Sequence, residues 1–113
     1  MGLHDGHRKR MKKRFDEYGL DNFDDHNVLE LLLFYVLPRG DVNPVAHELM
    51  DRFGSLAAVF DAPKEELKKV TGVGEKTASL IKLIPQINRR YMMSRSSFST
   101  ILDSSDKAGE YLV

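Results

Sequence analysis

The sequence predicts an all-α protein, a compact bundle of five to six helices. Apolar residues recur at three- to four-residue steps, as in the series Ala78, Ile81, Ile84, Ile87 and Tyr91. Glycine, proline and helix-capping residues divide the chain into segments of helical length. We therefore expect short turns between helices that pack around one core.

Composition limits the class of protein. The 113 residues suit one domain. The absence of cysteine excludes a disulfide framework, a thiolate zinc site and a cysteine nucleophile. The longest apolar run, Leu31–Leu37, is far too short to span a membrane. The basic N-terminus lacks the apolar core of a signal peptide, so we expect a cytoplasmic protein without a membrane partner.

Charge is segregated along the chain although the net charge is zero. Residues 1–14 carry six Lys/Arg and one Asp, whereas residues 15–35 carry six acids and no Lys/Arg. Residues 61–93 carry seven Lys/Arg and four acids. A neutral protein with this pattern can still present a positive face.

The first expected helix covers residues 7–18, with Met11, Phe15 and Tyr18 on one apolar stripe. Six of the seven residues 8–14 are basic. These cations can form a solvated face, a face that contacts phosphates, or the polar side of a lipid-surface helix.

The second expected helix begins at Asp24 or Asp25 and runs to Leu37, where Pro38 ends it. From Leu29 to Leu37, only Glu30 is charged. A helix without a polar face is typical of a protein core, so we expect this helix to lie at the centre of the bundle.

Two further helices are expected around a glycine turn. Asn43 and Pro44 are a cap followed by a first-turn proline, and that helix ends at Gly54. Ser55 can then cap a short helix that runs to Phe60.

A second glycine turn, Gly72-Val73-Gly74, separates a helical segment that starts at Pro63 from one that runs to about Tyr91. Glycine supplies positive φ values and leaves no Cβ between the backbone and a ligand. The first amides of the following helix can then face a phosphate.

The second turn resembles the helix-hairpin-helix motif of DNA-binding proteins that bind without sequence preference. Six positions fit that pattern, namely Val70, Gly72, Val73, Gly74, Ala78 and Ile81. The resemblance implies a tandem, SAM-like arrangement within a helical domain of residues 1–93, with a degenerate copy near 44–60 and the main copy near 63–91. The alternative is an αα-hairpin with a packing role only.

More of the chain resembles the N-terminal domain of the RadC family. The matching residues are Gly6-His7-Arg8, Arg14-Phe15, Leu29 to Tyr35, Pro38-Arg39, Pro44, Phe53 to Leu56 and Gly72 to Gly74. In that family a metal-binding domain of the JAB/MPN kind follows the helical domain. Residues 94–113 are expected to be a linker and the truncated start of such a domain, with a strand from Ile101.

The sequence offers no catalytic or metal-ligating set, because the four histidines form no His-x-His pair and zinc chemistry needs at least three placed ligands. We therefore expect no enzyme activity from these residues. We expect a DNA phosphate-binding module, with weak and sequence-independent affinity. The expected contact residues are Gly72, Val73, Gly74, Lys76, Thr77, Gly54, Ser55, Arg8 and Lys12.

Two features modify this expectation. Glu75 occupies the helix start that a phosphate would take, although Lys68, Lys69, Lys76 and other cations can offset its charge. The resemblance also implies a monovalent cation at the carbonyls of Thr71 or Val73, and no other cofactor. The alternative function is a protein-interaction or homodimerisation scaffold for the missing metal-dependent domain, without DNA binding.

Overall fold

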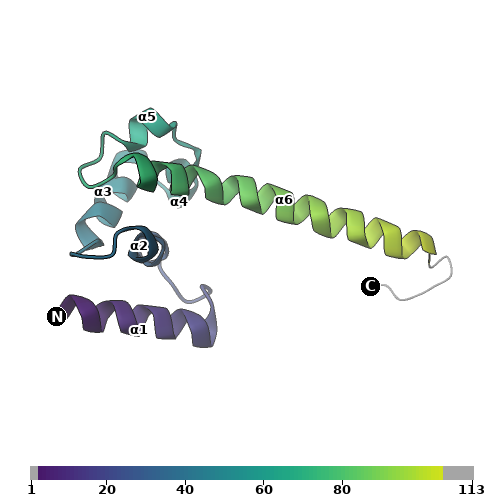
Figure 1. The fold of residues 1–113 in the computed structure, drawn as a ribbon, viewed down its shortest axis with the longest axis horizontal. Coiled ribbons are helices and arrows are strands. Elements are labelled where there is room, and N and C mark those ends of the chain that lie inside the picture. The colour runs from purple at the N-terminus through teal and green to yellow at the C-terminus, as the bar shows by residue number, and fades with distance from the viewer. Residues whose placement is uncertain (1–2, 106–113) are drawn as a thin grey trace. The chain divides into compact units, whose positions relative to one another are not determined.

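The structure is a computed structural model, and it describes residues 3–105. These residues form six helices and no strand, which confirms the all-α prediction and the expected number of helices. The helices are α1 (Leu3–Tyr18), α2 (Asp25–Val36), α3 (Asn43–Phe53), α4 (Leu56–Asp61), α5 (Lys64–Leu67) and α6 (Glu75–Ser105), shown in Figure 1. The chain divides into two compact units, Met1–Lys82 and Leu83–Val113. The domain boundary near residue 93 stays a prediction.

Helix α2 lies at the centre of the first unit, as its sequence predicts. It packs against α1, α3 and α4, and Leu29 and Leu33 are completely buried. Every helix of this unit and the turn before α6 supply core residues: Met11, Leu29, Leu31, Leu33, Phe34, Val42, Ala46, Leu49, Val59, Ala62, Leu67, Val70, Val73, Ala78 and Ile81. Each large side chain buried here contributes about 1.5–3 kcal/mol, so the second glycine turn is fixed to the same core as α2.

Glu30, the one charged residue in the apolar part of α2, is completely buried. Its Oε1 atom accepts a hydrogen bond from the Asn27 side chain at 3.3 Å, and its Oε2 atom lies 3.0 Å from His7 Nε2. A buried carboxylate is costly unless it is hydrogen-bonded. These contacts satisfy it and fasten α1 to α2.

Helix α3 begins one residue earlier than its sequence predicts. Asn43 is the first helical residue, and the carbonyl of Val42 accepts the first helical hydrogen bond, from Ala46 at 3.0 Å. The side chain of Asp41 accepts a hydrogen bond from the Asn43 amide, also at 3.0 Å. The prediction that Asn43 is the cap is therefore wrong, whereas Pro44 does lie in the first turn.

Helix α6 is longer than predicted. Residues 94–100 continue the helix instead of forming a linker, and Ile101 to Ser105 are helical instead of a strand. No glycine or proline follows Pro85 before Ser105, and serine disfavours a helix by only about 0.5 kcal/mol per residue. Residues 106–113, where we expect the start of another domain, lie outside the described residues. Within residues 3–105, no helix has the length and apolar character needed to cross a membrane.

Candidate functional site

The second glycine turn is a tight turn with a buried apolar side. The Val73 amide donates a hydrogen bond to the Val70 carbonyl at 3.0 Å, and both side chains are buried. Gly72 has a φ of 93°, and no non-glycine residue in the described chain has a positive φ. This combination defines a type II turn over residues 70–73, in which the third position favours glycine.

Gly72 is also required by packing. A Cβ atom at this position would lie 2.8 Å from Cγ2 of Val45, which belongs to α3. Such a distance is well inside van der Waals contact, so the turn approaches α3 too closely for any side chain. Gly72 is therefore explained by the fold, without a ligand.

Gly74 differs from Gly72 in both respects. Its φ is not positive, and a Cβ atom built on it would meet nothing within 4 Å. The residue is exposed at the start of α6. Neither backbone strain nor crowding within the protein explains a glycine here.

The start of α6 presents backbone amides to solvent. The first helical hydrogen bond runs from the Ala78 amide to the Gly74 carbonyl, at 3.0 Å. Among the described residues, no acceptor pairs with the amides of Glu75 and Lys76, and both residues are exposed. Unpaired amides at the positive end of a helix favour an anion.

Glu75 is held by two lysines of the preceding segment. Lys64 Nζ donates a hydrogen bond to Glu75 Oε2, and Lys68 Nζ donates one to Oε1 at 3.0 Å. The hydrogen bond from Lys64, followed by that from Lys68, lowers the pKa of Glu75. The hydrogen bond to Glu75 in turn raises the pKa of Lys68. The Glu75 carboxylate, which the sequence predicts to oppose an anion, is thus paired with two lysines beside the α6 amides.

The remaining predicted residues of this turn fall into two groups. Lys76 is exposed, and within residues 3–105 it has no carboxylate partner. Thr77 is only 2% exposed, so its side chain lies on the core side of α6 here, and its phosphate contact stays a prediction. Val73 belongs to the core, and its amide is already bonded within the turn. Of the turn's predicted contacts, Gly74 and Lys76 remain accessible.

The first glycine turn differs from the second in having a side-chain cap. Gly54 has a φ of 96°, and its amide donates a hydrogen bond to the Met50 carbonyl at the end of α3. The Ser55 hydroxyl accepts a hydrogen bond from the Ala58 amide at 3.0 Å, as the capping prediction requires. The Gly54 amide and the Ser55 hydroxyl thus hold the ends of the two helices, whereas the Leu56 and Ala57 amides have no acceptor among the described residues.

Arg8 and Lys12 contact α2 and not the second glycine turn. Arg8 donates hydrogen bonds to the carbonyls of Phe34 and Gly40, at 3.2 and 2.9 Å. Lys12 Nζ lies 4.7 Å from the centre of the Tyr35 ring. Helix α1 lies on the other side of α2 from α5 (Figure 1). The prediction that Arg8 and Lys12 join the turn in one phosphate-binding site is therefore not supported by their position.

Sequence patterns do not predict two contacts with residues of the second turn and the start of α6. Lys64 reaches Glu75 from α5, and Val45 reaches Gly72 from α3. Both contacts join residues that are distant in the sequence, so no local pattern signals them. Lys82, expected to add positive charge, donates a hydrogen bond to the Phe60 carbonyl at 2.9 Å and helps to fasten α6 to the end of α4.

Comparison with known proteins identifies a relative. The chain is similar to a UPF0758 protein of Fusobacterium nucleatum subsp. nucleatum, with 39% identity over 82 residues. The UPF0758 proteins are the RadC-like family. The alignment covers 73% of this chain and 35% of the relative, so the chain spans about a third of the length of the curated protein it matches. No family model matches the chain, and no solved structure matches it.

Proposed function

We propose that this chain is a non-catalytic DNA-binding module of a RadC-like protein, and that it binds backbone phosphates without sequence preference. One phosphate lies at the start of α6, against the amides of Glu75 and Lys76. The Lys76 side chain adds a charge-assisted contact. The proposal follows the likeness to a RadC-like relative and the helix-hairpin-helix pattern of the second turn. In the whole protein, a metal-dependent domain of the JAB/MPN kind would follow.

The observation that carries this proposal is Gly74. Its conformation and its surroundings would both accept a side chain, yet it stands directly before the free amides of α6. A glycine in such a place allows a ligand to approach the backbone closely. Glycine is also an acceptable helix cap, so the experiment has to separate these two reasons.

The structure implies a weaker grip than two turns and a basic helix would give. Three neutralised phosphates would reduce affinity about fortyfold between 50 and 200 mM salt, from the counterion-release slope. With the Ser55 hydroxyl engaged as a cap and Arg8 bound to carbonyls, we count one or two phosphates. The same slope then gives a loss of roughly fourfold to twelvefold.

The decisive experiment measures fluorescence anisotropy of a short labelled duplex at 50 and 200 mM salt. Asp and Ser are both good helix caps, so Gly74→Asp and Gly74→Ser keep the cap and add a Cβ atom. We expect Gly74→Asp to weaken binding roughly tenfold. The new carboxylate would repel the phosphate and remove its charge-assisted contact with the α6 amides. We expect a smaller loss for Gly74→Ser.

Ser55→Asp is the matched control, because it adds the same charge at the cap of α4 in the other turn. We expect its binding to stay within about twofold of wild type, as for an exposed charge outside the contact. Wild-type affinity for Gly74→Asp would exclude the turn as the contact. A wild-type protein that does not bind DNA at 50 mM salt would refute the function itself.

A monovalent cation at the Thr71 or Val73 carbonyl is part of the same proposal, and no other cofactor is proposed. Replacing Na⁺ by K⁺ at constant ionic strength tests it, because counterion release is unchanged and only a size-selective site would alter affinity. Equal affinities in the two salts would remove the cation from the proposal.

A further inference from the structure

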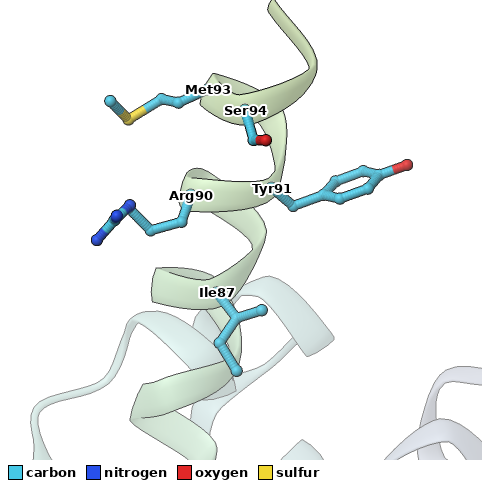
Figure 2. A pocket seen from close by; sticks show the side chains of 5 residues that line it. All are labelled: Ile87, Arg90, Tyr91, Met93 and Ser94. Atoms are coloured by element: carbon cyan, nitrogen blue, oxygen red, sulfur yellow. The ribbon is translucent and has the colours of Figure 1, made fainter. Parts of the chain in front are cut away.

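From Leu83 onward, α6 exposes large apolar side chains along one side. Leu83, Ile87 and Tyr91 follow each other at four-residue steps and are 49%, 53% and 54% exposed. Met92 and Met93 are exposed as well. Ile87, Arg90, Tyr91, Met93 and Ser94, all from α6, line a pocket, and Figure 2 shows Arg90 and Met93 on one side of the helix and Tyr91 on the other. Contiguous exposed apolar surface of this kind marks an interaction site.

The charges around this stripe are all positive. Between Glu75 and Asp103 the chain contains five Lys/Arg and no acid. At about 3.6 residues per turn, Arg90 and Arg95 flank the stripe on its two sides, and Arg89 lies on the opposite side of the helix. Among the side chains of residues 6–96, none of these three arginines has a carboxylate partner. We call Leu83, Ile87, Arg90, Tyr91 and Arg95 the basic face.

Pairing of two α6 helices with each other is disfavoured by these charges. Residues Ile84, Ile87, Tyr91 and Ser94 alternate three- and four-residue steps, as the seam of a coiled coil does. Arg90 and Arg95 then occupy the flanking positions, five residues apart, which face each other across a parallel pair. Arginine would meet arginine in such a pair, so the charges favour an acidic occupant of the basic face.

The same chain has an exposed surface of the opposite character. Residues 15–25, the end of α1 and the turn before α2, contain five acids and no Lys/Arg. All five acids are exposed. Phe15, Tyr18 and Leu20 in this segment are 37%, 68% and 41% exposed. We call residues 15–25 the acidic end.

The acids of the acidic end have almost no counter-ions. Glu17 lies 3.8 Å from Lys13, and in the part of the chain that the structure describes the other four acids have no cationic partner. Apart from Tyr35, every large exposed apolar side chain of residues 6–96 belongs to the acidic end or to α6 from Leu83 onward. The two surfaces thus share apolar content and carry opposite charges. Apart from Glu17, these charged side chains have no ionic partner among the side chains of residues 6–96.

We propose that the chain forms a homodimer in which the basic face of each copy docks on the acidic end of the other. Apolar contact supplies most of the affinity, and the opposite charges select the partner surface. A two-fold arrangement makes the contact twice and closes the assembly at two copies. The proposal is independent of DNA binding, and its test contains no DNA.

The test is charge reversal on each surface of the 113-residue chain, with mass measured by light scattering and sedimentation. One variant carries Arg90→Glu and Arg95→Glu, and the other carries Asp16→Lys and Asp21→Lys. Each variant alone brings like charges together at both contacts, so we expect the mass of a monomer, 12.9 kDa. In an equimolar mixture both contacts are again between opposite charges, and we expect the mass to double.

Arg89→Glu is the control, because it makes one charge reversal of the same kind on the opposite side of α6. It should keep the wild-type mass. Raising the salt concentration should weaken the wild-type dimer, because its charge pairs are exposed and screened.

Several outcomes would overturn the proposal. A wild-type chain that is monomeric at every concentration would exclude the homodimer. A monomer in which the basic face contacts the acidic end of the same chain would count as this outcome. A dimer that survives Asp16→Lys with Asp21→Lys would point to α6 pairing with itself. A mixture that stays monomeric, although each variant has the far-ultraviolet spectrum of wild type, would exclude the complementary contact.

A second pair of variants keeps the proposal testable if a charge reversal unfolds the protein. Ile87→Ser and Tyr18→Ser each remove one exposed apolar side chain from one surface without changing charge. Each should raise the dimer dissociation constant about tenfold, the loss expected for an apolar side chain at an interface. Unchanged dissociation constants for both would refute the docking mode.

Discussion

The two glycine turns of this protein begin with the same local geometry and end differently. In each, a glycine with positive φ, Gly54 or Gly72, lets the chain leave one helical segment and enter the next. In the first turn, Ser55 then uses its hydroxyl to cap α4. In the second, Gly74 has no side chain with which to cap α6. The first turn pairs the third amide of its helix, that of Ala58, with a side-chain cap, whereas the corresponding Thr77 amide of the second turn has no acceptor among the described residues.

This difference shows that one residue before a helix decides whether a side chain pairs with one of the first helical amides. The positive-φ glycine satisfies only the geometry of the turn. A capping side chain after it pairs with one of the amides that an external anion could otherwise contact. Two glycine turns of one chain can therefore differ in how the first amides of the following helix are paired.

The largest effect should come from Gly72→Ala. A non-glycine residue at positive φ costs about 1–2 kcal/mol, and forcing Cβ against Val45 adds about 1–3 kcal/mol. We expect the free energy of unfolding to fall by roughly 2–5 kcal/mol in urea denaturation. Such a loss would show that the second turn is held by packing as well as by turn geometry.

Repeating the substitution in a Val45→Ala background isolates the close approach. Without the valine methyl groups, Gly72→Ala should cost only the backbone part, about 1–2 kcal/mol. Equal costs in the two backgrounds would mean that contact with α3 does not restrict the turn, and Gly72 would then resemble Gly54.

Gly54→Ala should be milder than Gly72→Ala. A Cβ atom at Gly54 meets nothing within 4 Å, so only its φ of 96° opposes a side chain. We expect a loss of about 1–2 kcal/mol, with the same urea midpoint measurement. A loss as large as that of Gly72→Ala would show that the two turns are not distinguished by packing.

Ser55→Ala and Gly74→Ser form a pair that tests capping. Removal of a serine cap costs about 1 kcal/mol, so α4 should lose that stability. Gly74→Ser should leave stability unchanged or slightly higher, since serine caps at least as well as glycine. Thermal unfolding of both variants checks this, and a clear loss for Gly74→Ser would reveal a packing role for Gly74 that its surroundings do not show.

Much of the fold could be predicted because local patterns follow the same periodicities as the core. Val70, Val73, Ala78 and Ile81 of the second turn are all buried, as their spacing indicates. The serine-rich composition beyond residue 93 predicts a linker, whereas the structure continues α6 there. Serines without a glycine or proline do not end a helix.

The candidate site was predictable only in part. Gly74 and Lys76 are accessible, whereas Thr77 lies four residues before Ile81 and so on the core side of α6, a signal that periodicity did contain. Arg8 belongs to a run of basic residues, which is equally typical of a helix that binds phosphates. Its contacts with carbonyls 26 and 32 residues away depend on tertiary structure and leave no local pattern.

Glu75 gives the smallest and most specific prediction, because the first turn has no equivalent carboxylate at its helix start. Its pKa is lowered in the folded protein, so its contribution to stability is complete above the ordinary value of 4.5 and is lost as pH falls through the lower folded value. The raised pKa of Lys68 keeps the contribution of that lysine complete below its ordinary value of 10.5, and the contribution is lost as pH rises through the higher folded value. Glu75→Gln should therefore flatten the decline of stability in acid, which urea denaturation at pH 7 and at lower pH would measure.

The same substitution frees the charges of Lys64 and Lys68 beside the α6 amides. If the second turn binds phosphate, Glu75→Gln should strengthen binding to duplex DNA about threefold at 50 mM salt, the worth of an exposed charge pair. It should also steepen the salt dependence, because more cations face the phosphate. Glu17→Gln, which frees Lys13 on α1, is the control with the same charge change. Equal gains for the two variants would show a general effect of net charge and would remove the distinction between the second turn and the rest of the surface.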